Sequence, residues 1–197
     1  MDLGKAIQKS IDLYLKNFGV LFLAGLLVAI LSAVTIGIIA GPLIAGFIVL
    51  VMKLDRGEKA EVGEIFAHFD KFVPTLLIAI ICLVIPMIIG LIPIIGLLFG
   101  IIAGPIINLI FYAAIAFTVE KNIEPVEAIK KGYACFMTNP GMNWVYSFVI
   151  SLLSGVGVVA CIIGVILTIP IGTIGMTIAY QELSAKVDNA AGPSVQA

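Results

Sequence analysis

The sequence predicts an all-α membrane protein with about six transmembrane helices, arranged as three hairpins that are each preceded by an amphipathic interfacial helix. The first observation is composition: the 197 residues are 61% hydrophobic and 12% charged, with a mean hydropathy of +1.21. Soluble domains average about 25% charged residues. The second and third observations are long uncharged runs and an internal repeat. An aqueous fold could not bury this much apolar surface, so we expect the chain to lie in a bilayer.

Three uncharged runs predict the number of crossings. They contain 36, 48 and 50 residues, at 17–52, 72–119 and 132–181. A crossing helix needs about 20 apolar residues, and lipid-exposed backbone must be helical to satisfy its own hydrogen bonds. Each run therefore accommodates two crossings. Two helices and a turn barely fit in the first run, so whether the hairpin at about 18–52 fully crosses the membrane is left open.

The charged residues predict the orientation. With two crossings per run, all 11 Lys and Arg and all 12 Asp and Glu face one compartment. The positive-inside rule makes this compartment the cytoplasm. We therefore expect a multi-pass protein of the cell inner (cytoplasmic) membrane, with both termini cytoplasmic.

A unit of about 60 residues recurs along the chain. The letters IIAGP occur at 38–42 and again at 101–105. Each unit opens with an amphipathic stretch whose apolar and charged residues recur with a helical period, as in a helix that lies in the membrane interface. The predicted repeat units, which can pack around a pseudo-threefold axis, are 3–61, 62–124 and 125–185. Together they form one membrane domain, 1–185, and 186–197 is expected to be a flexible polar tail.

Prolines near corresponding points of the three units predict changes in helix direction. Proline removes a backbone donor and crowds the preceding turn, so it starts or kinks a helix. The residues expected at these bends are Gly41, Pro42, Gly104, Pro105 and Pro170.

Four segments carry a family resemblance: LKNFG, GPLIAGF, KLDRGEKAEVGEIFAHFDKF and EPVEAIKKGYACFMTNPGMNW. Over residues 3–184 the chain resembles a broad group of poorly characterised bacterial and archaeal integral membrane proteins. This group includes the YciC-type proteins and the membrane domain fused to some glycerophosphoryl diester phosphodiesterases. The resemblance implies a six-helix membrane domain without an assigned reaction. The phosphodiesterase domain is missing here, so its activity is not carried over.

The residue pattern disfavours enzymes, ion pathways and metal sites. The predicted spans contain no ionisable residue of the kind that marks proton pathways. The single histidine, His68, lies on the polar face of the second amphipathic stretch, with no second histidine to share a metal. The three cysteines lack the paired spacing of a metal or redox site. A net charge of -1 gives no basic surface for nucleic acid. We predict no catalytic residue and no cofactor.

Asn108 is the most informative polar residue in the predicted spans. A side-chain amide in hydrocarbon requires a partner on a neighbouring helix. We interpret Asn108 as an interhelical polar contact. The alternative is that Asn108 and the serines of the fifth crossing line a narrow polar path for a small neutral solute.

Two functions fit the sequence. The first is a non-catalytic membrane scaffold or accessory subunit that docks membrane or cytoplasmic proteins through its cytoplasmic-side interfacial helices. The cations expected on this docking face are Lys53, Arg56, Lys59, Lys130 and Lys131. The alternative is a small pore or carrier for neutral or lipid-like molecules, formed within the bundle or by self-association.

Overall fold

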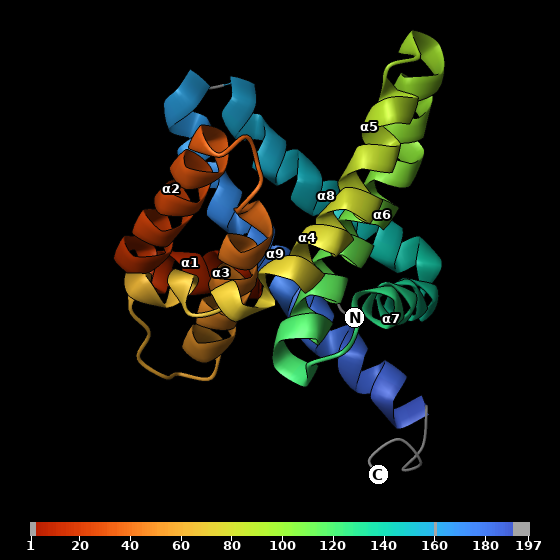
Figure 1. Ribbon diagram of the computed structural model, residues 1–197. Helices are drawn as coiled ribbons and strands as arrows, with labels where there is room; N and C mark the ends of the chain where they lie inside the picture. The colour runs from red at the N-terminus through yellow and green to blue at the C-terminus, as the bar shows by residue number, and fades with distance from the viewer. Residues whose placement is uncertain (1–2, 160, 191–197) are drawn as a thin grey trace.

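The protein is described by a computed structural model over residues 3–159 and 161–190, where every regular element is a helix (Figure 1). This confirms the predicted all-α class. The α-helices are α1 Leu3–Lys16, α2 Phe18–Val34, α3 Ala40–Asp55, α4 Phe72–Ala79, α5 Ile85–Gly90, α6 Pro93–Lys121, α7 Pro125–Met137, α8 Pro140–Val159 and α9 Cys161–Ala190. Two 3-10 turns, η1 Val62–Phe66 and η2 Phe69–Lys71, precede α4, and a π-helical turn, η3 Ile80–Val84, joins α4 to α5.

Among the described residues, two segments are long and apolar enough to cross a membrane, Val62–Cys82 and Leu98–Lys121. A bent pair, Gly4–Lys16 with Phe18–Val34, passes the same test together but turns by 95° at its break. The helices of the first hairpin, α2 and α3, have 17 and 16 residues. They are about 24–26 Å long, against a hydrocarbon core of about 30 Å. The described residues therefore indicate membrane association, whereas the six-crossing layout stays a prediction.

Short turns join the helices at the end of the molecule remote from most charged residues. Between α2 and α3 the chain reverses at Thr35–Ile39, where Ile36 and Gly37 have φ of 53° and 80°. Glycine adopts such a positive φ without the steric cost of a Cβ atom. The α5–α6 turn is at 91–92. The uncharged stretches 34–37, 89–96 and 155–164 of the sequence predict turns between the paired helices. The first two overlap the observed turns, and the third includes residue 160, which lies outside the described residues.

The buried core lies toward the charged end of the bundle. Helices α3, α6 and α9 contact one another there, with Leu43, Ile48, Ile115 and Ile174 fully buried. In Figure 1, α5 and the first half of α6 stand away from the other helices. Leu98 and Ile102 in that half of α6 are 56% and 60% exposed. The molecule thus combines a packed base with an apolar arm.

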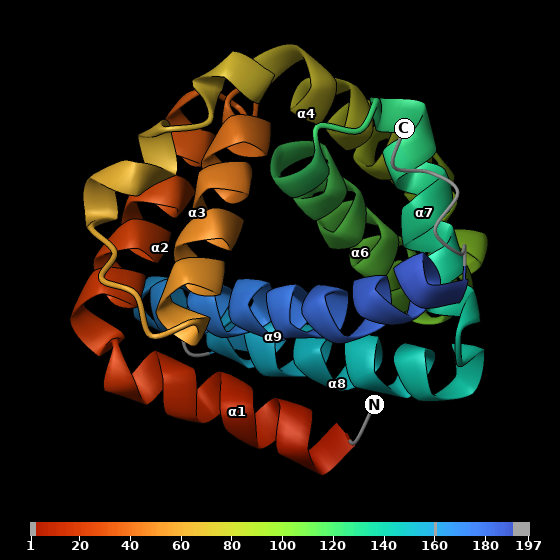
Figure 2. The same cartoon turned by 90° about the horizontal axis from the view of Figure 1, so that it is seen from below.

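The amphipathic segments pack in a cyclic order around the base (Figure 2). The turn η1 lies on α3, α7 lies on α6, and α1 lies on α9. Two of these contacts are close: a Cβ at Gly46 would lie 2.2 Å from the Ile65 carbonyl oxygen, and one at Gly132 would lie 2.9 Å from the Ile110 carbonyl oxygen. Each segment therefore packs on the second helix of a different hairpin.

The second amphipathic stretch is not an α-helix, contrary to the periodicity. It forms η1 and η2 instead. A capping box between Glu61 and Glu64 starts η1, and Gly63 weakens helix formation there. Pro74 has no N–H to donate to Asp70 and crowds the preceding turn. An α-helix could therefore not continue regularly from this stretch into α4.

The prolines expected at bends occupy two kinds of position. Pro42 is the third residue of α3, where its missing N–H breaks no intrahelical hydrogen bond. Pro105 and Pro170 lie inside α6 and α9. Helix α9 continues to Ala190, so the expected tail at 186–197 begins as helix. An ion pair between Asp188 and Lys121 holds this end against α6, and residues 191–197 are outside the described residues.

Candidate functional site

One face of α6 is built from residues four positions apart. Gly96, Gly100, Gly104, Asn108 and Tyr112 follow this spacing, which places each beside the next along one ridge of the helix, and all five line the same hollow. A Cβ added at Gly100 or Gly104 would meet no atom within 4 Å. At Gly100 and Gly104 this face is therefore bare backbone beside open space, and its second half carries the amide of Asn108 and the phenol of Tyr112.

Two hollows flank this face. The first has a volume of about 490 Å³ and lies between α6 and the residues Cys82 and Pro86 of η3 and α5. The second has a volume of about 500 Å³ and lies between α6 and α8, where Phe148, Ser151 and Leu152 line it. The hollows share four residues of the α6 face: Gly96, Gly100, Gly104 and Asn108. We call the two hollows together the α6 cavity.

Hydrogen bonds to α8 and α9 form a polar layer at the inner end of the α6 cavity. The Asn108 side-chain amide donates to the Ser151 hydroxyl over 3.0 Å, which joins α6 to α8. The hydroxyls of Tyr112 and Thr173 are 3.2 Å apart, which joins α6 to α9. The layer therefore offers amide and hydroxyl groups to a molecule in an otherwise apolar space.

Trp144 connects α8 to the part of α6 that precedes Pro105. Its indole N–H donates to the Ile102 carbonyl over 2.8 Å, and its ring stacks on Phe148, with centroids 5.1 Å apart. Pro105 removes a donor from this part of α6 and crowds the preceding turn. Trp144 supplies that turn with an external donor and places Phe148 at the wall of the cavity.

Comparison of the chain with protein-family models, with curated proteins and with solved structures finds no match. The family resemblance therefore stays a prediction.

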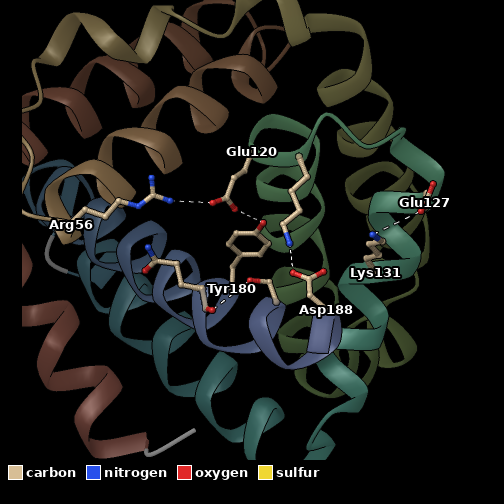
Figure 3. A network of polar contacts seen from close by, with 9 residues as sticks. Arg56, Glu120, Glu127, Lys131, Tyr180 and Asp188 are labelled. Atoms are coloured by element: carbon tan, nitrogen blue, oxygen red, sulfur yellow. Dashed lines mark hydrogen bonds and ion pairs between the residues drawn. The ribbon is translucent and has the colours of Figure 1, made fainter. Parts of the chain in front are cut away.

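A second polar cluster lies at the charged end of the bundle (Figure 3). Arg56, which follows α3, pairs with Glu120 at the end of α6 over 3.2 Å. The Tyr180 hydroxyl of α9 donates to the other oxygen of Glu120 over 2.6 Å, and Lys121 pairs with Asp188. The cluster ties the ends of α3, α6 and α9 together, so its first role is structural.

Three of the five predicted docking cations have carboxylate partners within the chain. Lys53 pairs with Glu64 over 2.8 Å, Arg56 pairs with Glu120, and the Lys131 ammonium lies 4.0 Å from Glu127. The hydrogen bond to Glu64 raises the pKa of Lys53. Lys59 and Lys130 complete the predicted set. Cations that already have partners attract an acidic protein surface less strongly than unpaired ones.

Metal binding has no support among the described residues. No group of three or more His, Cys, Asp or Glu side chains there could hold a metal ion. His68 lies between η1 and η2. Cys82 and Cys135 are both buried and free, and the side chain of Cys161 is outside the described residues.

Sequence reasoning singled out Asn108 but not the cavity beside it. The signal that could have found it is the run G-x3-G-x3-G-x3-N-x3-Y from Gly96 to Tyr112, whose period of four marks one helix face. The pairing of Tyr112 with Thr173 joins residues 61 positions apart. No local pattern predicts such a pair.

Proposed function

We propose that this protein binds lipid-like or small neutral molecules in the α6 cavity and carries them within or across the membrane. The observation that supports this most is the pair of hollows that share one glycine face and end at the Asn108–Ser151 hydrogen bond. Ligand sites are concave, mostly apolar spaces of about 300–1,000 Å³ with a few placed polar groups. The α6 cavity fits this description.

The ligand class follows from the surroundings of the cavity. Its rim carries exposed apolar side chains, with Ile101 47% exposed on α6 and Leu152 54% exposed on α8. A molecule that reaches the cavity through this rim must dissolve in hydrocarbon. The amide and hydroxyl groups of the polar layer favour a ligand with at least one hydrogen-bonding group, such as an amphiphile.

The proposal includes the membrane topology: six crossings in three hairpins, a pseudo-threefold repeat, and both termini on the cytoplasmic side of the inner membrane. The cyclic packing of η1, α7 and α1 on α3, α6 and α9 supports the repeat. Each uncharged run accommodates two crossings, so the charged segments that flank the runs lie on one side of the membrane. This one-sided placement of the Lys and Arg residues supports the cytoplasmic orientation. Membership of the YciC-type group is part of the same proposal.

Filling the cavity tests the function. The full-length protein is reconstituted into phosphatidylcholine vesicles, and transfer of a fluorescent phospholipid and uptake of glycerol are measured. Gly104→Leu places a large side chain in open space beside the cavity. Gly19→Leu makes the same change on α2, and an added Cβ meets no atom within 4 Å at either position. We expect Gly104→Leu to lose most transfer or uptake and Gly19→Leu to retain it.

Two outcomes would refute the carrier function. In the first, the wild-type protein neither transfers the phospholipid nor takes up glycerol. In the second, the Gly104→Leu variant is as active as the wild type. A second copy packed on the glycine face would also fill the hollows, because small residues allow close helix contact. Native mass spectrometry that shows a dimer, together with an absence of transfer, would replace the carrier by self-association.

A scaffold or accessory subunit is the second candidate, and an uncovered face of α7 favours it. Val126, Tyr133 and Met137 are exposed on this helix, whereas Ala128 and Gly132 face α6 and the core. A partner protein could cover this apolar face. Reproducible recovery of a second polypeptide in native mass spectrometry, lost in Tyr133→Glu but not in Lys59→Glu, would support docking through α7.

A further inference from the structure

Helix α1 presents three different faces around its circumference. Ala6, Ser10, Leu13 and Tyr14 are buried against the bundle. The second face is apolar and exposed, with Ile11 39% and Leu15 64% exposed. The third carries the lysines. A helix with an uncovered apolar edge beside a cationic edge is typical of the membrane interface.

The elbow between α1 and α2 supports this placement. The two helices meet at 95°, so α1 runs roughly along the membrane plane when α2 runs through it. Aromatic rings gather at the elbow: Tyr14 contacts Phe18 edge-on at 5.4 Å between centroids, and Phe18 stacks on Phe22 at 5.3 Å. Aromatic side chains concentrate near membrane surfaces.

A hollow of about 350 Å³ lies beside the cationic face of α1. Its charged lining consists of Lys5, Lys9, Lys16, Asp12 and Asp55. Asp55, at the end of α3, holds the Lys9 ammonium at 2.8 Å. Three lysines and two aspartates leave a formal charge of +1 around the hollow. This charge complements one phosphodiester group, which carries a single negative charge.

The geometry points to a binding site for the headgroup of an anionic phospholipid on α1. The phosphate lies in the hollow beside Lys5 and Lys16, and an acyl chain follows the apolar edge formed by Ile11 and Leu15. Anionic lipids favour basic segments at the cytoplasmic leaflet. The site is remote in sequence from the α6 cavity and does not depend on its function.

The test compares two lipids that differ only in headgroup. The purified full-length protein is incubated with equal amounts of phosphatidylglycerol and phosphatidylcholine carrying identical acyl chains, and bound lipid is measured by native mass spectrometry. Each lysine near an anionic surface contributes roughly a fivefold factor. We expect Lys5→Gln with Lys16→Gln to lower the preference for phosphatidylglycerol roughly tenfold or more. These substitutions leave the Lys9–Asp55 pair in place.

Two further variants separate the site from general charge and from misfolding. Lys59→Gln with Lys130→Gln removes the same charge outside the hollow and should leave the preference unchanged. Asp12→Asn removes a negative charge from the hollow and should raise the preference severalfold, which an unfolded protein would not do. Equal binding of both lipids by the wild type, an equal loss in the Lys59/Lys130 variant, or no gain in Asp12→Asn would each overturn the proposal.

Discussion

Replacing Gly46 with alanine tests the packing that closes the base of the bundle. Gly46 lies in the middle of α3, and its added Cβ would lie 2.2 Å from the Ile65 carbonyl oxygen and 2.6 Å from two other backbone atoms of Ile65. Side chains can rotate away from such an overlap, but here the obstacle is backbone, and Ile65 is fully buried. The turn η1 must therefore move away from α3.

The size of the effect follows from two opposing terms. Alanine stabilises a helix interior by up to about 1 kcal/mol relative to glycine. Overpacking a well-packed site typically costs about 1–3 kcal/mol, and sometimes more. Because the obstacle is backbone, we expect a cost of about 2–3 kcal/mol. Subtracting the alanine gain of about 1 kcal/mol leaves a net loss of about 1–2 kcal/mol in the free energy of unfolding. For a chain of this size, about 1 kcal/mol shifts Tm by roughly 2–4 °C.

The assay is thermal unfolding of the detergent-purified protein, followed by the fluorescence of Trp144. Gly104→Ala is the matched control, because its Cβ meets nothing within 4 Å and only the gain in helix propensity remains. We expect a Tm lower than wild type by roughly 2–8 °C for Gly46→Ala, and a Tm equal to or above wild type for Gly104→Ala. If Gly46→Ala melts no lower than Gly104→Ala, η1 does not lie on α3 as described.

Three other predictions concern single side chains. Burial, with a smaller effect of Asp188, raises the pKa of the Cys135 thiol to about 12. A membrane-impermeant maleimide at pH 8 should therefore label Cys135 only after denaturation. Rapid labelling of the folded protein would contradict the burial of this thiol. Because a hydrogen bond to a charged group is worth about 1.5–3 kcal/mol, Tyr180→Phe should lower the Tm by roughly 3–12 °C, and an unchanged Tm would argue against the contact with Glu120. Asn108→Leu and Ser151→Ala should each lower the free energy of unfolding by about 0.6–2 kcal/mol. The double variant should lose less than the sum of the two single losses. If the losses measured by thermal unfolding are strictly additive, the two side chains do not interact.

Composition and periodicity predicted the elements that depend on local patterns. Long uncharged runs predicted apolar helices, and the uncharged stretch that ends at Gly37 predicted the turn between α2 and α3. The amphipathic period of α1 and α7 predicted two helices that the structure contains, and each packs one face on the bundle, α1 on α9 and α7 on α6. The same period failed at 62–71, where Gly63 and Pro74 act against a continuous α-helix.

The candidate site depended on contacts that no local pattern encodes. The α6 cavity depends on how α5 and α8 lie against α6, and the angle between helices is a tertiary property. The ion pair between Arg56 and Glu120 joins residues 64 positions apart. From the sequence, Arg56 was expected to be a cation available for docking. Only the folded chain shows that Glu120 is its partner.

The glycines of α6 bear on whether the α6 cavity is a binding site or only a gap in the packing. Packing explains the glycine at position 96, since a Cβ there would lie 2.6 Å from the Gly90 carbonyl oxygen. Gly100 and Gly104 have no such neighbour, although each glycine inside a helix costs about 1 kcal/mol relative to alanine. Alanine at both positions would therefore stabilise α6 without a clash, and would narrow the space beside its backbone. A ligand or a second copy of the chain that packs on this face would give that cost a physical reason, which the packing within the described residues does not.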